Sequence, residues 1–262
     1  SGSQTPASPE RAHLFPSVPP PSPMDWKEGI IPGRFRGKTV IVTGAGAGIG
    51  RATALRLAKE DARVVAVDLN TLRMEALLEN PAAHGTIGIV ADLNSESDIQ
   101  RIMSAAGSDI DGLALIAGVS DDLEPLHEVD DEVWERIFRI NVTGPFRLSR
   151  QVIPAMLSRG AGSIVNLASQ AGLRGSVGGA AYTAAKHALI GLTRSEAYTY
   201  SARGVRINAV VPMPTRNSLD SNYGFPGGLG PLPAASLVPA DLEAAAVAAP
   251  VTYLLSDDAV SV

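Results

Sequence analysis

The sequence has 262 residues, enough for one domain, or at most two, with a sizeable apolar core. Hydrophobic residues make up 45% and charged residues 19% of the chain, which excludes intrinsic disorder of the chain as a whole. A net charge of −5 offers no electrostatic basis for binding nucleic acid or an anionic membrane.

Cysteine, histidine and hydropathy narrow the class of protein further. The chain has no cysteine and its four histidines show no metal-ligand spacing, so neither a disulfide framework nor a metal site is predicted. No apolar run reaches the ~18 residues that a membrane-spanning helix needs. Together these features favour a soluble, cytoplasmic enzyme that acts on a small molecule.

The first 35 residues differ in composition from the rest, because they hold eight of the 19 prolines. A stretch rich in Pro and Ser without apolar periodicity predicts an extended, poorly ordered arm, and it lacks the apolar region of a secretory signal. A partner-binding role for Pro19–Pro21 stays open as the alternative. We expect one folded domain over residues 36–262.

From Arg36 on, short runs rich in Val and Ile alternate with helical patterns. Strands are predicted at Thr39–Thr43, Val64–Val67, Ile87–Val90, Leu113–Ile116, Ser163–Leu167 and Val205–Val211. Helices are predicted at Gly50–Glu60, Thr71–Leu78, Ser95–Ala106, Asp131–Arg159 with a break near Asn141–Gly144, and Ala181–Ala202. This alternation predicts the α/β class, with a doubly wound parallel sheet covered by helices on both faces.

A glycine-rich loop, Thr43–Gly50, joins the first strand to the first helix. The strict GxGxxG pattern fails at Ile49, and the pattern that fits is TGxxxGxG. Glycines allow a tight turn and close approach of a pyrophosphate, while the helix N-terminus offers N–H donors. The loop predicts nucleotide binding; the alternative is an ordinary tight turn.

Asp68 ends the second strand, where a carboxylate can accept hydrogen bonds from the ribose hydroxyls and repel a 2′-phosphate. It therefore favours NAD(H) over NADP(H). The alternative is a helix-capping or loop aspartate, although Asn70 and Thr71 are capping candidates too, and Arg73 nearby complicates the choice.

Tyr182 and Lys186 stand four residues apart on a predicted helix, so their side chains share a face. A neighbouring cation stabilises tyrosinate, which makes Tyr182 a candidate general acid/base. Ser169 follows the fifth predicted strand and could hold the reacting oxygen, or simply cap a loop. Asn141 lies in the predicted helix break, where a freed carbonyl could hold a water, or it is an ordinary cap.

In this order, the motifs resemble those of the short-chain dehydrogenase/reductase family across about residues 36–211. The matching stretches are TGAGAGIG, the acidic Asp68, NVTG at Asn141–Gly144, SIVNLAS ending at Ser169, and YTAAK at Tyr182–Lys186. The resemblance implies a Rossmann-type fold and an NAD(P)-dependent enzyme that interconverts a secondary alcohol and a ketone.

The resemblance also implies roles for individual residues. Tyr182 would be the acid/base, Ser169 would orient the substrate oxygen, and Lys186 would bind the nicotinamide ribose and lower the pKa of Tyr182. Asn141 would hold a water of a proton relay. The implied cofactor-binding residues are Gly44, Ala47, Gly48, Ile49, Gly50, Asp68, Asp92, Leu93, Ala117, Gly118, Tyr182, Lys186 and Pro212.

Three departures from the family pattern bear on the site. Leu115-Ile116 replaces an asparagine pair that ties adjacent strands, so we expect reduced stability or a tuned site. Pro212-Met213 replaces a Pro-Gly pair beside the nicotinamide, and Thr215 is a displaced candidate for the threonine that normally follows. The family's last strand is not found before Val262; truncation, disorder and a real loss are the alternatives.

Two further segments carry predictions. Residues 213–239 match the position of a substrate lid, with Tyr223, Phe225 and Leu229 as apolar contacts; a disordered loop is the alternative. The acidic run from Asp121 to Glu132 is interpreted as a solvated loop with helix N-terminal acids, and His187 as structural.

The leading hypothesis is therefore an oxidoreductase that uses NAD(H) in preference to NADP(H), with no metal. Its substrate would be a 3-oxoacyl thioester, a hydroxysteroid, or a sugar or cyclic alcohol, with a faint similarity to hydroxysteroid-type members. The alternative is an NAD-binding sensor or structural subunit with little turnover. The family resemblance implies a homodimer or homotetramer that pairs through Asp131–Arg159 and Ala181–Ala202.

Overall fold

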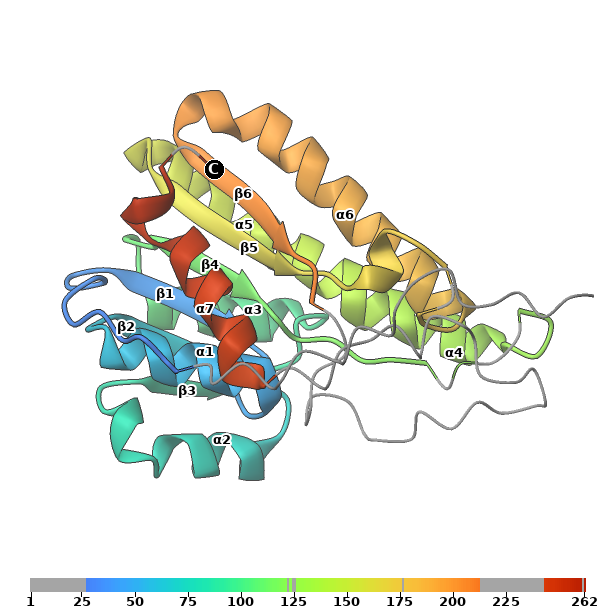
Figure 1. Cartoon of the computed structure of the whole chain (residues 1–262), viewed down its shortest axis with the longest axis horizontal. Helices are drawn as coiled ribbons and strands as arrows, with labels where there is room; N and C mark the ends of the chain where they lie inside the picture. The colour runs from blue at the N-terminus through green and yellow to red at the C-terminus, as the bar shows by residue number, and fades with distance from the viewer. Residues whose placement is uncertain (1–26, 122, 124–125, 176, 213–242, 261) are drawn as a thin grey trace, which may run out of the picture.

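A computed structural model describes residues 27–121, 123, 126–175, 177–212, 243–260 and 262. Its parallel sheet has the strand order β3-β2-β1-β4-β5-β6 (Figure 1). The strands are β1 (Thr39–Thr43), β2 (Arg63–Asp68), β3 (Ile87–Val90), β4 (Gly112–Leu115), β5 (Gly162–Leu167) and β6 (Val205–Val210). The doubly wound prediction is confirmed, and each strand end lies within one residue of its predicted place. The predicted arm as far as Trp26 and the predicted lid fall outside the described residues.

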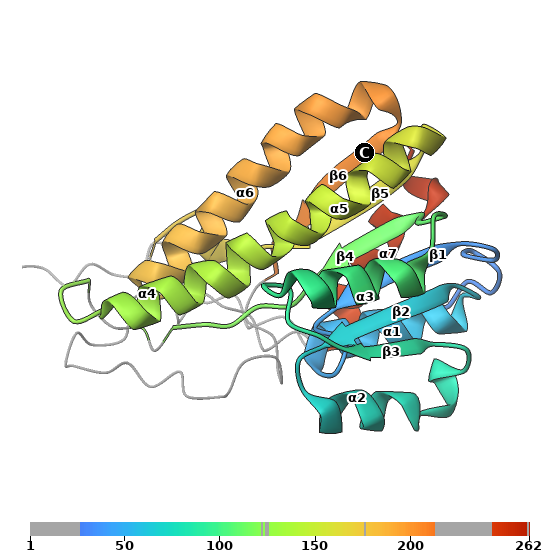
Figure 2. The same cartoon turned by 180° about the vertical axis from the view of Figure 1, so that it is seen from behind.

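Each face of the sheet is buried beneath three helices, so the strands are apolar on both sides. Val40 and Val42 point into one core, and Ile41 between them points into the other. The first core is closed by α1 (Gly48–Lys59), α2 (Thr71–Leu78) and α7 (Ala244–Leu255). The second lies under α3 (Glu96–Ala106), α5 (Gly144–Arg159) and α6 (Ala180–Tyr200), which Figure 2 shows from behind.

The long predicted helix Asp131–Arg159 is interrupted, as expected, near Asn141. It consists of α4 (Asp131–Phe138), a π-helical turn η2 (Arg139–Thr143) and α5. In contrast, α7 was not predicted. Its sequence is apolar nearly throughout and contains Pro250, so it lacks the polar stripe by which an amphipathic helix is recognised.

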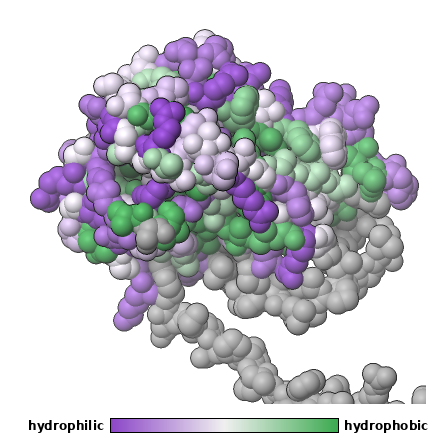
Figure 3. Space-filling model, turned by 90° about the horizontal axis from the view of Figure 1, so that it is seen from above, coloured by the Kyte–Doolittle hydropathy of each residue, from purple (hydrophilic) through white to green (hydrophobic). Residues whose placement is uncertain are grey.

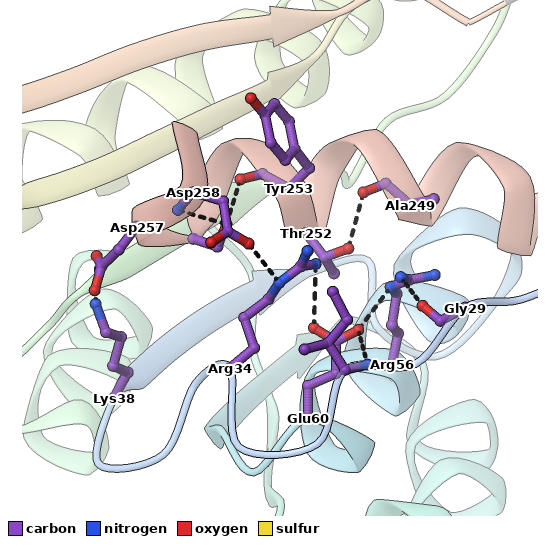
Figure 4. Close-up of polar contacts among 12 residues, drawn as sticks. Gly29, Arg34, Lys38, Arg56, Glu60, Ala249, Thr252, Tyr253, Asp257 and Asp258 are labelled. Carbon is purple, nitrogen blue, oxygen red and sulfur yellow. Dashed lines mark hydrogen bonds and ion pairs between the residues drawn. The ribbon is translucent and has the colours of Figure 1, made fainter. Parts of the chain in front are cut away.

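The chain is already packed before Arg36, the expected start of the domain. Phe35 is fully buried in the first core, and its backbone N–H donates to the carbonyl of Glu60 (2.9 Å). Glu60 is itself buried and pairs with Arg34 and Arg56, while Arg34 also pairs with Asp258 (Figure 4). This cluster joins the segment before β1 to α1 and to the end of α7, so the packed chain begins earlier than predicted.

Strand order also fixes where a ligand can bind. Strands β1 to β3 follow one another towards one side of the sheet and β4 to β6 towards the other, so the strand order reverses between β1 and β4. At such a point a crevice opens beyond the carboxyl ends of the strands. On the face seen from above, hydrophobic residues form separate patches among hydrophilic ones (Figure 3). No helix among the described residues is long and apolar enough to cross a membrane.

Candidate active site

A cavity of about 650 Å³ opens at the carboxyl edge of the sheet, across the reversal between β1 and β4. Of the predicted site residues, all but Asn141 line it. They are Gly44, Ala47, Gly48, Ile49, Gly50, Asp68, Asp92, Leu93, Ala117, Gly118, Ser169, Tyr182, Lys186 and Pro212. The fold thus gathers residues that lie up to 168 positions apart in the sequence, from Gly44 to Pro212.

The glycine loop leaves no room for side chains at Gly44, Gly46 and Gly50. Gly44 has a φ of +67°, and a Cβ there would lie 2.9 Å from the backbone of Ala117. A Cβ on Gly50 would lie 2.0 Å from the carbonyl oxygen of Gly44. The N-cap of α1 is Ala47, which has no capping side chain, so the first-turn N–H groups lack a side-chain cap. This cradle fits the pyrophosphate of a dinucleotide.

Asp68 braces the glycine loop from the end of β2. Its carboxylate accepts hydrogen bonds from the backbone N–H of Gly46 (2.8 Å) and of Asn70 (2.9 Å). The N-cap of α2 is Asn70, which accepts from the N–H of Arg73 (2.9 Å), so Asp68 is not the helix cap. Arg73 lines the same cavity, and a Cβ on Gly46 would lie 2.6 Å from its Cβ.

Thr43, which the sequence analysis did not select, joins β1 to the end of β4. Its hydroxyl oxygen accepts hydrogen bonds from the backbone N–H of Ile116 (2.9 Å) and of Ala117 (3.1 Å). The side-chain tie expected to be lost with Leu115-Ile116 is therefore supplied from β1. The available signal was that Thr43 is the first residue of the TGxxxGxG pattern.

Asn141 lies behind the cavity wall, fully buried in the π-turn. Its amide donates to the carbonyls of Val119 (2.9 Å) and Ile137 (3.0 Å), and its oxygen accepts from the N–H of Val119 (3.3 Å). A Cβ on Gly118 would lie 2.8 Å from that oxygen and 3.5 Å from Lys186 Nζ. Asn141 thus clamps the loop after β4 to the helix break.

Tyr182 and Lys186 project from the first two turns of α6, which begins beyond the carboxyl ends of the strands (Figure 1). Lys186 Nζ lies 5.5 Å from the ring centroid of Tyr182 and donates to the carbonyl of Leu167 (2.9 Å). The ammonium is buried, and this loss of solvent lowers the pKa of Lys186 to about 8.

Ser169 stands at the N-cap of a short turn, η3 (Gln170–Gly172), where its hydroxyl accepts from the N–H of Ala171 (3.2 Å). The turn packs closely on α6, because a Cβ on Gly172 would lie 2.7 Å from the carbonyl oxygen of Lys186. Ser169 therefore caps a loop and also lines the wall that carries Tyr182.

The prediction that the acidic run is a solvated loop is wrong for Asp121. This side chain is 6% exposed and accepts hydrogen bonds from the backbone N–H of Gly179 (2.9 Å) and of Tyr182 (2.8 Å). It therefore caps α6, whereas Asp130 caps α4 through the N–H of Val133 (2.6 Å). Because its partners lie 58 and 61 residues away, no local pattern could reveal this role.

Other predicted residues take smaller parts. Asp92 accepts from the N–H of Asn94 (2.9 Å), and the carbonyl of Pro212 accepts from the N–H of Gln170 (3.4 Å). His187 is exposed, with its ring 2.9 Å from the carbonyl of Thr183. Within the described ranges, no group of three or more His, Asp or Glu side chains could hold a metal ion.

The chain is similar to known proteins in sequence and in structure. A family model described as short chain dehydrogenase matches residues 38–224. Asnovolin H dehydrogenase nvfC of Aspergillus novofumigatus is 40% identical over 185 residues, which are 69% of this chain and 70% of that protein.

Solved structures agree with the sequence matches. Levodione reductase superposes with a TM-score of 0.78 at 33% identity, covering 87% of this chain and 94% of that one. A variant of actinorhodin polyketide ketoreductase with NADPH gives a TM-score of 0.75 at 28% identity, covering 86% and 92% of the two chains.

Proposed function

This chain belongs to the short-chain dehydrogenase/reductase family, and on that premise we propose that it interconverts a secondary alcohol and a ketone with NAD(H). The observation that carries the proposal is the cavity that Tyr182, Lys186 and Ser169 line together with the glycine loop. An acid/base, a cation and a hydroxyl beside a dinucleotide cradle supply what this reaction requires.

In the proposed mechanism the side chains of Tyr182, Ser169 and Lys186 carry out and support proton transfer. Tyr182 gives its phenolic proton to the carbonyl oxygen in reduction and takes a proton from the hydroxyl in oxidation. Ser169 hydrogen-bonds the same substrate oxygen, and the ammonium of Lys186 stabilises negative charge on the Tyr182 oxygen. The nicotinamide, when bound, supplies or accepts the hydride.

The π-turn is proposed to serve the proton relay. A π-turn removes one carbonyl from the helical hydrogen-bond ladder, and such a carbonyl at Asn141 would hold the relay water. The side chain of Asn141 is already used to hold Val119, so its amide acts as a brace for the cavity wall.

We assign the cofactor as NAD(H) rather than NADP(H) because the Asp68 carboxylate lines the cavity at the end of β2. A carboxylate there accepts hydrogen bonds from ribose hydroxyls and repels a 2′-phosphate. Arg73 lines the same region, and the related polyketide ketoreductase carries NADPH, so the Asp68 charge is the feature to test.

For the substrate, we propose an apolar secondary alcohol or ketone. The names of the related proteins describe a dehydrogenase, a reductase of levodione and a polyketide ketoreductase, which supports a carbonyl or carbinol as the reacting group. Apolar side chains in the cavity wall, Ile140 and Val177 among them, support an apolar body around that group.

The test is Tyr182→Phe, measured on a panel of secondary alcohols and ketones that the native enzyme turns over. We expect kcat to fall at least about a thousandfold while the Kd for NADH stays within about threefold. Tyr253→Phe is the matched control, because Tyr253 on α7 is 41% exposed and does not line the cavity. Native-like turnover by Tyr182→Phe would overturn the assignment and favour an NAD-binding sensor or structural subunit.

We also propose a homodimer or homotetramer that pairs through α4, α5 and α6. Trp134, Phe146 and Tyr198 expose large apolar surfaces on these helices, which supports a contact between copies. Sedimentation velocity tests it: a single species of monomer mass at micromolar concentration contradicts the pairing.

A further inference from the structure

We propose that Asp121 is a positioning residue that fixes Tyr182 for proton transfer by holding the backbone from which its side chain projects. The inference rests on the proposed role of Tyr182. It adds a residue outside the motifs, placed in the loop after β4 and acting on a helix that begins about sixty residues later.

The first support is the hydrogen bonding at the start of α6. The first N–H groups of a helix have no partner within the helix, and the N-cap here is Gly179, which has no side chain to offer. Asp121 replaces it, with Oδ1 accepting from Gly179 N–H and Oδ2 from Tyr182 N–H. Both carboxylate oxygens are used, so the amide of asparagine would satisfy only one of the two donors.

The second support is that the residues facing this contact are glycines, which leave room for the Asp121 carboxylate and the Tyr182 ring. A Cβ on Gly179 would lie 2.4–2.6 Å from the carboxylate atoms of Asp121, so only glycine admits the carboxylate. A Cβ on the preceding Gly178 would lie 2.7 Å from Cδ1 of Tyr182. The aromatic ring is therefore seated on Gly178 while its backbone N–H is held by Asp121.

The loop that carries Asp121 is also fixed nearer to β4, which is the third support. Val119, two residues before Asp121, is clamped through both its N–H and its carbonyl by Asn141. Gly118 and Val119 line the cavity, so Asp121 connects this wall to the helix that carries Tyr182 and Lys186. Displacement of a reacting group by about 1 Å can lower a rate a hundredfold, which is the scale expected when such a bridge is lost.

The experiment compares Asp121→Ala, Asp121→Asn and Gly179→Ala with Asp130→Ala, which removes a capping carboxylate from α4 instead. The measurements are kcat on a substrate of the native enzyme, the Kd for NADH, and circular dichroism to verify folding. We expect kcat to fall about thirtyfold to a hundredfold in Asp121→Ala, less in Asp121→Asn, with the Kd for NADH within threefold. Asp130→Ala should keep kcat within twofold.

Double variants separate positioning from general loosening of the fold. If Asp121 acts through the Tyr182 hydroxyl, adding Asp121→Ala to Tyr182→Phe lowers single-turnover rates no further. Likewise, Asp121→Ala with Gly179→Ala should be no slower than the slower single variant. Gly179→Ala and Asp121→Asn carry the test should Asp121→Ala not fold.

Two results overturn the proposal: native-like kcat in folded Asp121→Asn and Gly179→Ala, or losses that multiply when Asp121→Ala is added to Tyr182→Phe. Neither outcome coincides with failure of the proposed function, because that failure is native-like turnover by Tyr182→Phe alone.

Discussion

Buried charged side chains are held by different partners at the two edges of the sheet, the amino edge where the strands begin and the carboxyl edge where they end. At the amino edge, Glu60 is completely buried but faces Arg34 and Arg56, and these ion pairs hold the segment before β1 against α1 (Figure 4). At the carboxyl edge, Lys186 and Asp121 are also buried, yet within the described part of the chain neither makes a salt bridge. Backbone carbonyl and N–H groups hold them instead.

The difference shows what each edge is built for. A buried ion pair satisfies both charges and leaves nothing for a ligand, so it can only fasten segments of the chain together. A buried charge held by backbone groups keeps its field, and such groups are typical of functional sites. We therefore expect variants at the amino edge to change stability and variants at the carboxyl edge to change turnover.

The largest expected effect is on turnover at the carboxyl edge. Lys186→Met should lower kcat at least about a thousandfold, equivalent to about 4 kcal/mol of transition-state stabilisation, because it removes the ammonium that lies 5.5 Å from the Tyr182 ring. Steady-state kinetics measures this, with Lys59→Met as the control, since Lys59 forms an exposed ion pair with Glu28. A kcat within tenfold of native would contradict the distinction between the edges.

The next effect is on stability at the amino edge. Glu60→Gln should lower the free energy of unfolding by about 3 kcal/mol, because Arg34 and Arg56 keep their charges and lose their buried partner. Urea denaturation measures this loss, while kcat per folded molecule should not change. The control is Arg36→Met, which breaks an exposed pair with Asp61 and should lower stability by less than about 1 kcal/mol.

Lys186 also gives the nucleotide-free protein a characteristic pH dependence. Its folded pKa of about 8 lies below its ordinary value of 10.5, so between these values the unfolded chain binds more protons than the folded one. The free energy of unfolding should therefore rise from pH 8 towards pH 10.5, by up to about 3 kcal/mol. Lys186→Met should remove that rise, and an unchanged slope in this variant would show that another group is responsible.

Glu196 tests whether a buried carboxylate that does not line the cavity only destabilises the fold. It lies about 15 Å along α6 from Lys186, and one of its carboxylate oxygens is buried without a hydrogen bond to the described residues. Burial raises the pKa of Glu196 from 4.5 to about 7, so the free energy of unfolding should fall as pH rises between those values.

Glu196→Gln should be more stable than the native protein at pH 8 by on the order of 2 kcal/mol, with little difference near pH 4.5. Urea titrations at the two pH values measure the change. A variant that gains nothing at pH 8 would mean that the Glu196 charge has a partner that repays its burial.

The smallest expected effect is on cofactor preference. Asp68→Asn removes the charge and keeps only one of the two oxygen acceptors, so the ratio of NADH to NADPH affinity should fall about tenfold, equivalent to about 1.4 kcal/mol. Fluorescence titration with both cofactors measures the ratio. An unchanged ratio would mean that a group other than Asp68 sets the cofactor preference, and Arg73→Met would then be the next variant.

Much of the fold was predictable because its signals are local. The apolar strands, the helices between them and the glycine loop after Thr43 are encoded by hydrophobic runs and turn residues within a few positions. The pairing of Tyr182 with Lys186 follows from helical periodicity alone. The helix α7 was missed because a nearly uniform apolar sequence has no periodicity to detect.

The sequence by itself determined the strand–helix order, the motif residues and the edge of the sheet at which they collect, since parallel strands deliver their carboxyl ends to one side. The remaining contacts arise only when the chain folds: Asp121 caps α6, Thr43 binds the end of β4, and Arg34 pairs with Glu60. These contacts depend on which distant groups the packed elements bring together, and no local pattern in the chain records that.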